Sequence, residues 1–223
     1  MSSFVLKLLA MIFMCCDHIG KSIIPGTAPL YYIGACSFPL FAFQLIQGYI
    51  HTHNFKNYVK RLAIFALISQ IPFMLFLSTF ASDIFKLNIF FTLLLGLLAI
   101  YIYDNKNCNI FTKLLTILAI IAISIIFKTD YSAWGILLIL TFFIFRNKKI
   151  LLSICFILLC ILKYLKYFIF NYNSIYLILC LFTALSLIFI LFYNGKRGKK
   201  ISSFFYMFYP IHLSIIYLIH MFI

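Results

Sequence analysis

The sequence predicts an all-α fold, a polytopic transmembrane helical bundle that forms a single integral membrane domain over residues 1–223. Hydrophobic residues make up 65% of the chain and charged residues only 10%, too few to cover a soluble protein of this length. The apolar runs are long and nearly uniform in hydropathy, without the alternation that a transmembrane barrel requires. The lipid bilayer is therefore the predicted partner of most of the surface.

Roughly 20 helical residues cross a hydrocarbon core of about 30 Å, and shorter segments are tolerated inside a bundle. On that scale the chain divides into about nine membrane segments, within a range of about eight to ten. The sixth and seventh are short, so one of them is alternatively a re-entrant or interfacial segment. In order, the predicted segments are 4–25, 30–51, 59–79, 85–103, 110–127, 131–146, 149–165, 173–193 and 203–222.

The basic residues predict the orientation, because Lys and Arg gather in cytoplasmic loops. If the N-terminus is cytoplasmic, thirteen of the 18 Lys and Arg residues fall on the cytoplasmic side and five on the other. We expect a bacterial plasma-membrane protein with its N-terminus inside, and its C-terminus outside if the segments number nine. The charges lie between apolar segments and form no stripe on a soluble surface, so the net charge of +14 does not indicate nucleic-acid binding.

Asp17 and His18, near the outer end of the first segment, are the leading candidates for chemistry. Ionisable side chains inside hydrocarbon are costly and are usually kept for function. Neighbours on a regular helix do not face each other, so a direct pair requires local unwinding. Helix-breaking residues follow the pair, namely Gly20, Pro25, Gly26 and Pro29. Alternatively Asp17 pairs with Lys21 one turn later and His18 alone enters a pocket, or an ion pair only fixes packing.

Other segments carry polar residues at compatible depths. With a helical rise of about 1.5 Å per residue, His212 in the last segment and Gln70 in the third both fall near mid-membrane. One pocket can collect them, although amides and hydroxyls in membrane helices often only bond across helices. The side chains expected to line this pocket, besides His212, are Gln44, Gln47, Gln70, Asn88 and Thr92.

The run from His51 to Arg61 is basic and lies on the predicted cytoplasmic side. His51, Lys56, Lys60 and Arg61 suit the phosphates of a nucleotide-like cofactor, although simple anchoring by positive charge also explains them. The basic residues at 196–200 are expected to act only in anchoring. No metal site is expected, because the seven cysteines are scattered and the histidines of this run have no carboxylate or thiolate nearby.

Ordered stretches of the chain resemble the TraX family of membrane proteins. They include Asp17-His18-Ile19-Gly20, Ser37-Phe38-Pro39-Leu40-Phe41, Ser69-Gln70-Ile71-Pro72-Phe73, Asn88-Ile89-Phe90-Phe91-Thr92 and Tyr209-Pro210-Ile211-His212. The family is named for a conjugation protein that N-acetylates pilin. The resemblance implies an N-acetyltransferase or related acyltransferase that uses cytoplasmic acetyl-CoA or another acyl-CoA. It further implies His18 as the catalytic group, Asp17 as its support and His212 as a second candidate.

The acceptor of the acyl group is expected to be an amine or hydroxyl of a peptide, a pilin or a glycan. His18 can act as a base or as a covalent nucleophile. Two other function classes stay open. One is a small proton-coupled transporter with Asp17 and His18 as a relay, although the paired repeats usual in transporters are not visible. The other is a non-catalytic accessory protein that holds a partner within the membrane.

Overall fold

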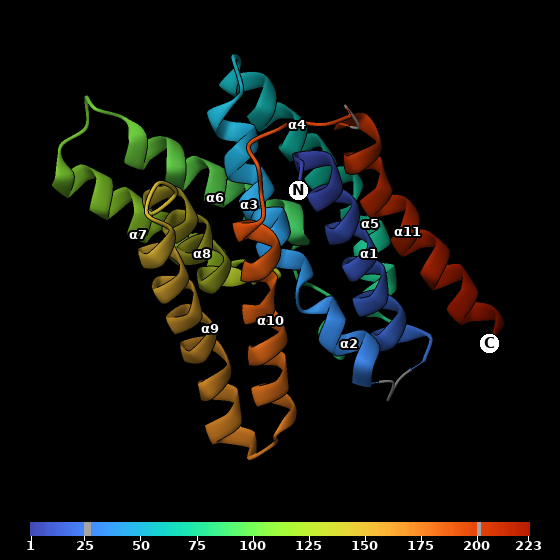
Figure 1. Ribbon diagram of the computed structural model, residues 1–223. Helices are drawn as coiled ribbons and strands as arrows, with labels where there is room; N and C mark the ends of the chain where they lie inside the picture. The colour runs from blue at the N-terminus through green and yellow to red at the C-terminus, as the bar shows by residue number, and fades with distance from the viewer. Residues whose placement is uncertain (25–27, 200–201) are drawn as a thin grey trace.

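The computed structural model describes residues 1–24, 28–199 and 202–223, and almost all regular structure in them is helical (Figure 1). Extended pairing in these ranges is limited to one isolated parallel bridge between Leu87 and Thr129. The all-α prediction is therefore confirmed. The helices are α1 (Ser3–Ser22), α2 (Ala28–Gly34), α3 (Ser37–Ile50), α4 (Phe55–Ile68), α5 (Gln70–Leu77), α6 (Ile89–Asp104), α7 (Ile110–Ile126), α8 (Ser132–Ile144), α9 (Lys149–Asn171), α10 (Ile175–Leu191) and α11 (Ser202–Phe222).

Each of the nine predicted segments corresponds to a helix or to two consecutive helices. The second segment contains α2 and α3, and the third contains α4 and α5, which bend by 41° where they meet. By length and apolar composition, four helical stretches of the described residues can cross a membrane, namely α1, α2 with α3 (Pro29–Ile50), α9 and α11, or up to five if the bent pair α4 and α5 counts as one span. The remaining apolar helices, α6, α7, α8 and α10, are shorter. The count of nine spans stays a prediction.

The seventh segment is longer than the predicted 149–165, because α9 continues to Asn171. Lys163 does not end this apolar helix, since its Nζ lies 4.0 Å from the ring centroid of Trp134 and 4.8 Å from that of Tyr164. Aromatic faces stabilise a cation at such distances. These contacts allow α9 to remain helical past Lys163 in an apolar stretch.

Two prolines lie just after the points where the second and third predicted segments divide into two helices. Pro39 and Pro72 each lie in the first turn of a helix, α3 and α5, where a backbone N–H has no helical partner to lose. The next helix, α6, is capped by Asn88, whose side chain accepts a hydrogen bond from the Phe90 N–H at 3.0 Å. Local sequence signals therefore mark the starts of α3, α5 and α6.

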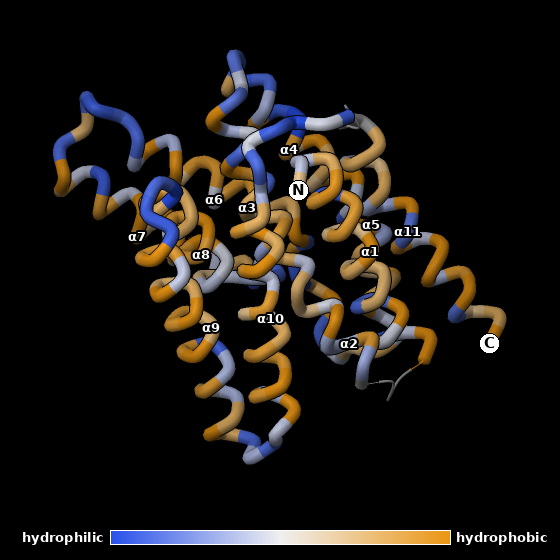
Figure 2. Tube along the Cα trace, viewed as in Figure 1, coloured by the Kyte–Doolittle hydropathy of each residue, from blue (hydrophilic) through white to orange (hydrophobic). Residues whose placement is uncertain are grey.

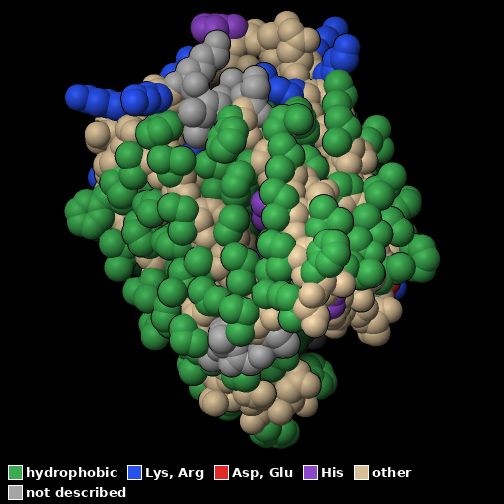
Figure 3. Space-filling view, turned by 90° about the vertical axis from the view of Figure 1, so that its right-hand side faces the viewer, with side chains coloured by type: hydrophobic (Ala, Val, Ile, Leu, Met, Phe, Trp, Pro, Cys, Tyr) green, Lys and Arg blue, Asp and Glu red, His purple; other side chains and the backbone are tan. Residues whose placement is uncertain are grey.

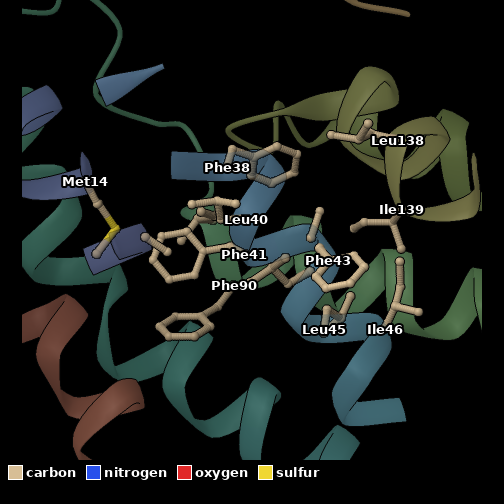
Figure 4. Packing of buried hydrophobic residues seen from close by; sticks show 14 of the residues in the cluster. Met14, Phe38, Leu40, Phe41, Phe43, Leu45, Ile46, Phe90, Leu138 and Ile139 are labelled. Atoms are coloured by element: carbon tan, nitrogen blue, oxygen red, sulfur yellow. The ribbon is translucent and has the colours of Figure 1, made fainter. Parts of the chain in front are cut away.

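Helix α3 forms the centre of the core, and its residues 37–46 are all buried. Its side chains Phe41 and Phe43 lie between Met14 of α1, Phe90 of α6 and Ile139 of α8 (Figure 4). Since α1 and α6 both pack around α3, polar groups on their inner faces are brought within one region of the bundle.

Polar connections gather at one end of the molecule, which we call the basic end. The N-terminus, the α3–α4 loop and the segment after α10 lie there (Figures 1 and 2). The backbone N–H groups of Ser3 and Phe4 donate to the carbonyls of Lys196 and Arg197, at 2.8 and 3.1 Å. Lys and Arg side chains collect at this end, above a largely hydrophobic surface (Figure 3). This segregation agrees with the positive-inside pattern, and the orientation itself stays a prediction.

Candidate functional site

Two cavities lie beside α1. The larger, of about 450 Å³, is lined from the basic end by cationic residues, and we call it the basic cavity. The smaller, of about 160 Å³, is lined by Asp17 and His18, and we call it the histidine cavity. Met14, Ile89 and Tyr209 border both. These three side chains therefore form the layer between the cavities.

One face of α1 contributes to both cavities. Ser3 and Lys7 line the basic cavity, Met14 borders both, and His18 and Lys21 line the histidine cavity. The intervals are three, four or seven residues, which place side chains on one helical face. A single helix thus carries polar groups from the basic end to the histidines.

His18 and His212 are in direct contact, although 194 residues separate them. His18 Nδ1 lies 2.7 Å from His212 Nε2, and the two rings are nearly parallel, with an interplanar angle of 9°. His212 Nδ1 in turn lies 2.8 Å from the Phe208 carbonyl oxygen, one turn back on α11. The His212 side chain is buried and, unlike His18, is not among the lining residues of the histidine cavity.

These contacts fix the direction of the hydrogen bonds. The Phe208 carbonyl can only accept, so His212 Nδ1 carries the hydrogen. In the neutral state His212 Nε2 is then an acceptor and His18 Nδ1 a donor. The lone pair of His18 is consequently on Nε2, which lies 3.8 Å from Asp17 Oδ2. His18 Nε2 is thus the basic atom that the histidine pair presents.

Asp17 pairs with Lys21, as one of the alternatives from the sequence proposed. Lys21 Nζ donates to Asp17 Oδ2 at 2.6 Å, four residues apart on α1. The helix is regular through Gly20 and ends at Ser22, so the local unwinding that a direct Asp17–His18 pair would require does not occur in α1. Pro25 and Gly26 lie outside the described residues. A continuous helix nevertheless lets Asp17 and His18 line the same cavity.

A second carboxylate, Asp130, lines the histidine cavity from the loop between α7 and α8. Its backbone N–H donates to the Leu87 carbonyl at 2.8 Å, which joins this loop to the one before α6. Lys128 Nζ also donates to Asp83 Oδ2 across these loops, at 2.9 Å. That hydrogen bond is the main cause of an Asp83 pKa below its usual range. The two contacts together position Asp130.

The basic cavity is suited to an anion. Lys7, Arg61 and Arg197 line it, and the described lining residues include no carboxylate. Arg197 and Arg61 are near enough to Lys7 for their charges to repel its own. Lys7 and Arg61 lie over aromatic rings, but no carboxylate among the described lining residues neutralises the three cations, which favours a multiply charged anionic group such as phosphate. His51 and His53 lie at the rim formed by the α3–α4 loop.

Gln44 and Gln47 line the basic cavity, as predicted for a pocket. Gln44 Oε1 accepts a hydrogen bond from Ser3 Oγ at 2.6 Å. Its amide nitrogen is buried and has no acceptor among the described residues. A buried donor left in this way is available to a ligand.

Gln70, Asn88 and Thr92 do not line either cavity. Asn88 Nδ2 donates to Gln70 Oε1 at 2.9 Å and to the Ala66 carbonyl at 2.7 Å, while Gln70 Nε2 donates to the Lys86 carbonyl at 2.8 Å. Thr92 Oγ1 accepts from the backbone N–H of Tyr131 at 3.3 Å. These three predicted pocket residues instead hold α4, α5, α6 and α8 together.

Lys56 and Lys60 are exposed and are not among the lining residues of the basic cavity. Tyr58, Arg61 and Leu62 follow three- and four-residue spacing and form the face of α4 that lines the cavity. Lys56 and Lys60 lie on a different face of the same helix. Arg61 and His51 are therefore the predicted phosphate ligands that the structure places at the cavity.

Sequence reasoning missed Lys7, Asp130, Arg197 and Tyr209. Lys7 and Tyr209 had a signal, because they share a helical face with His18 and His212 respectively. Arg197 had none, and it was assigned to anchoring. Its position depends on the backbone hydrogen bonds between the N-terminus and the segment after α10, which no local pattern reveals.

Comparison with known proteins shows which family the sequence belongs to. A sequence model described as TraX protein matches residues 2–220. The probable fimbrial assembly protein FimC, serogroup H1, of Dichelobacter nodosus is 29% identical over 236 aligned residues, which cover 96% of this chain and 94% of that protein. No solved structure matches the chain. Because the family match spans nearly the whole sequence, the chain belongs to the TraX family.

Proposed function

We propose that the protein is a membrane-embedded acetyl- or acyltransferase. An acyl-CoA donor binds in the basic cavity, and an amine or hydroxyl acceptor enters the histidine cavity. The observation that carries the proposal is the position of His18, which lines the histidine cavity and lies next to the three residues that border both cavities. A base next to the boundary between two ligand sites is what group transfer requires.

The donor phosphates are assigned to Lys7, Arg61 and Arg197 in place of Lys56 and Lys60. Charge-assisted hydrogen bonds from Arg to phosphate are short and often bidentate. The proposal also sets the orientation: the basic end faces the cytoplasm, because acyl-CoA is made there and these cations line the cavity at that end.

His18 Nε2 takes the proton of the attacking amine or hydroxyl. The resulting imidazolium keeps its Nδ1–H bond to His212, and Asp17 Oδ2 at 3.8 Å stabilises its positive charge. Lys21 holds Asp17 in place from the next turn. The fimbrial-assembly name of the relative favours a fimbrial subunit peptide as acceptor over a glycan.

Labelled acetyl-CoA tests the proposal. Purified protein in lipid vesicles is incubated with [¹⁴C]acetyl-CoA and either a peptide with a free amino terminus or an amino sugar. We expect label on an acceptor, and a loss of about 100-fold or more in His18→Ala, the usual size of a general-base contribution. The matched control is His220→Ala, since His220 is on α11 but lines neither cavity.

Four outcomes separate the routes and the function classes. Label on the protein itself before acceptor is added indicates the covalent route through His18. If no label reaches protein, peptide or sugar, and His18→Ala behaves as wild type, the enzyme proposal is wrong. Proton-coupled uptake that disappears in Asp17→Asn would then support the transporter. Function that stays intact in both His18→Ala and Asp17→Asn would support the accessory role.

A further inference from the structure

The Tyr209 hydroxyl is a buried polar group at the boundary of the two cavities. Tyr209 lies on α11, is 3% exposed, and belongs to the lining of both the basic and the histidine cavity. Its hydroxyl has no hydrogen-bond acceptor among the residues that the structure describes. The Ile89 backbone N–H lies near enough to donate to the hydroxyl oxygen, but the O–H itself has no acceptor, which costs about 1–3 kcal/mol that phenylalanine would not carry.

The ring of Tyr209 is held beside the histidine pair. Its centroid lies 6.3 Å from that of His18, 5.5 Å from that of His212 and 5.3 Å from that of Phe90, with edge-on geometry to His18 and Phe90. Tyr209 and His212 are three residues apart and share a face of α11. The Tyr209 ring is therefore held beside the base by contacts on three sides.

Two other buried side-chain atoms lack a partner in the described parts of the chain, and neither has this position. Gln44 lines the basic cavity but not the histidine cavity, and so lies on the side proposed for the donor phosphates. Ser69 Oγ lines neither cavity. Of the three atoms, the Tyr209 hydroxyl is the one located where an acyl group would pass from donor to acceptor.

Building on the proposed function, we propose that Tyr209 donates a hydrogen bond to the carbonyl oxygen of the acyl group during transfer. The acceptor lone pair attacks the thioester carbon, the new bond forms, and the carbonyl π electrons move onto the oxygen next to Tyr209. His18 Nε2 takes the acceptor proton. When the carbonyl re-forms, the carbon–sulfur bond breaks, and the CoA sulfur leaves with the bonding pair and receives the proton from His18. A preplaced donor at the developing oxyanion lowers this barrier.

The test compares Tyr209→Phe with Tyr217→Phe, the same change on the same helix at a residue that lines neither cavity. Acetyl-CoA labelled with ¹³C at the thioester carbonyl is bound to each protein without acceptor, and its carbonyl stretch is read by infrared difference spectroscopy. Acetyl transfer to the peptide acceptor and the Kd for acetyl-CoA are measured in parallel.

We expect the bound carbonyl to absorb at lower wavenumber in wild type and Tyr217→Phe than in Tyr209→Phe. The Tyr209→Phe rate constant kcat should fall by about 100-fold, the usual effect of losing one oxyanion donor, with Kd changed less than about threefold. Equal carbonyl frequencies, or equal kcat, in wild type and Tyr209→Phe overturn the role of Tyr209 while leaving the transferase proposal intact. If wild type neither binds acetyl-CoA nor transfers label, the proposed function fails and this inference fails with it.

Discussion

Replacing His212 tests whether it fixes the hydrogen on His18 Nδ1. In His212→Leu, the acceptor 2.7 Å from His18 Nδ1 is removed and a side chain of moderate size still fills the space. His212 Nε2 accepts from the His18 imidazolium that forms in the reaction, and a hydrogen bond to a charged group contributes about 1.5–3 kcal/mol. Since about 1.4 kcal/mol corresponds to tenfold in rate, kcat should fall by roughly ten- to hundredfold. His212→Gln keeps an acceptor oxygen and should recover much of this loss.

The assay is acetyl transfer from labelled acetyl-CoA to a peptide, together with the Kd for acetyl-CoA. His212 is not among the lining residues of the basic cavity, so donor binding should stay within about twofold of wild type in both variants. His220→Gln is the control on the same helix, because His220 bonds instead to the Ser22 carbonyl. A kcat in folded His212→Leu equal to that of wild type would refute the assigned hydrogen-bond direction.

Three more predictions concern the surroundings of the site. Arg197→Gln should weaken acetyl-CoA binding by about tenfold through loss of one charge-assisted contact, measured by calorimetry, whereas exposed Lys60→Gln should leave it nearly unchanged. In Gly34→Ala the new methyl would clash with Asp17 Cβ, so the free energy of unfolding should fall by about 1–3 kcal/mol and the melting temperature with it. An unchanged melting temperature would contradict this close packing of α2 on α1. Because Lys128 holds the Asp83 pKa below its usual value, the ion pair contributes above the ordinary carboxyl pKa and is lost as pH falls through the lowered one. Wild type and Asp83→Asn should therefore differ in melting temperature at pH 7 and converge in strongly acidic solution.

The helical fold could be predicted because hydrophobic run length is a local property. Every predicted segment contains a helix, since the residues that form it are neighbours in the sequence. The breaks at Cys36 and Ser69 also have a local signal, because Pro39 and Pro72 follow three residues later and have no N–H for the carbonyl one turn back. The length of α9 was underestimated because it depends on packing between helices: Trp134, on another helix, stabilises Lys163.

The candidate site divides along similar lines. His18, Asp17 and His212 were selected because charge and imidazole inside apolar helices are costly, and the structure brings His18 and His212 together. Polarity alone could not separate Gln44, which lines a cavity, from Gln70, whose amide is already bonded to the Lys86 carbonyl. That difference depends on whether a partner from another segment satisfies the amide.

A direct pair of Asp17 with His18 was expected to require a broken helix, and the structure shows how a regular helix brings both to one cavity. Their side chains diverge on α1, so each meets a different neighbour: Asp17 lies against Gly34 of α2, and His18 stacks on His212 of α11. The histidine cavity lies between these neighbours and is bordered by both side chains. A regular helix can therefore supply a base and its counter-charge to one cavity, because the 3.8 Å between Nε2 and Oδ2 permits charge stabilisation without a direct hydrogen bond.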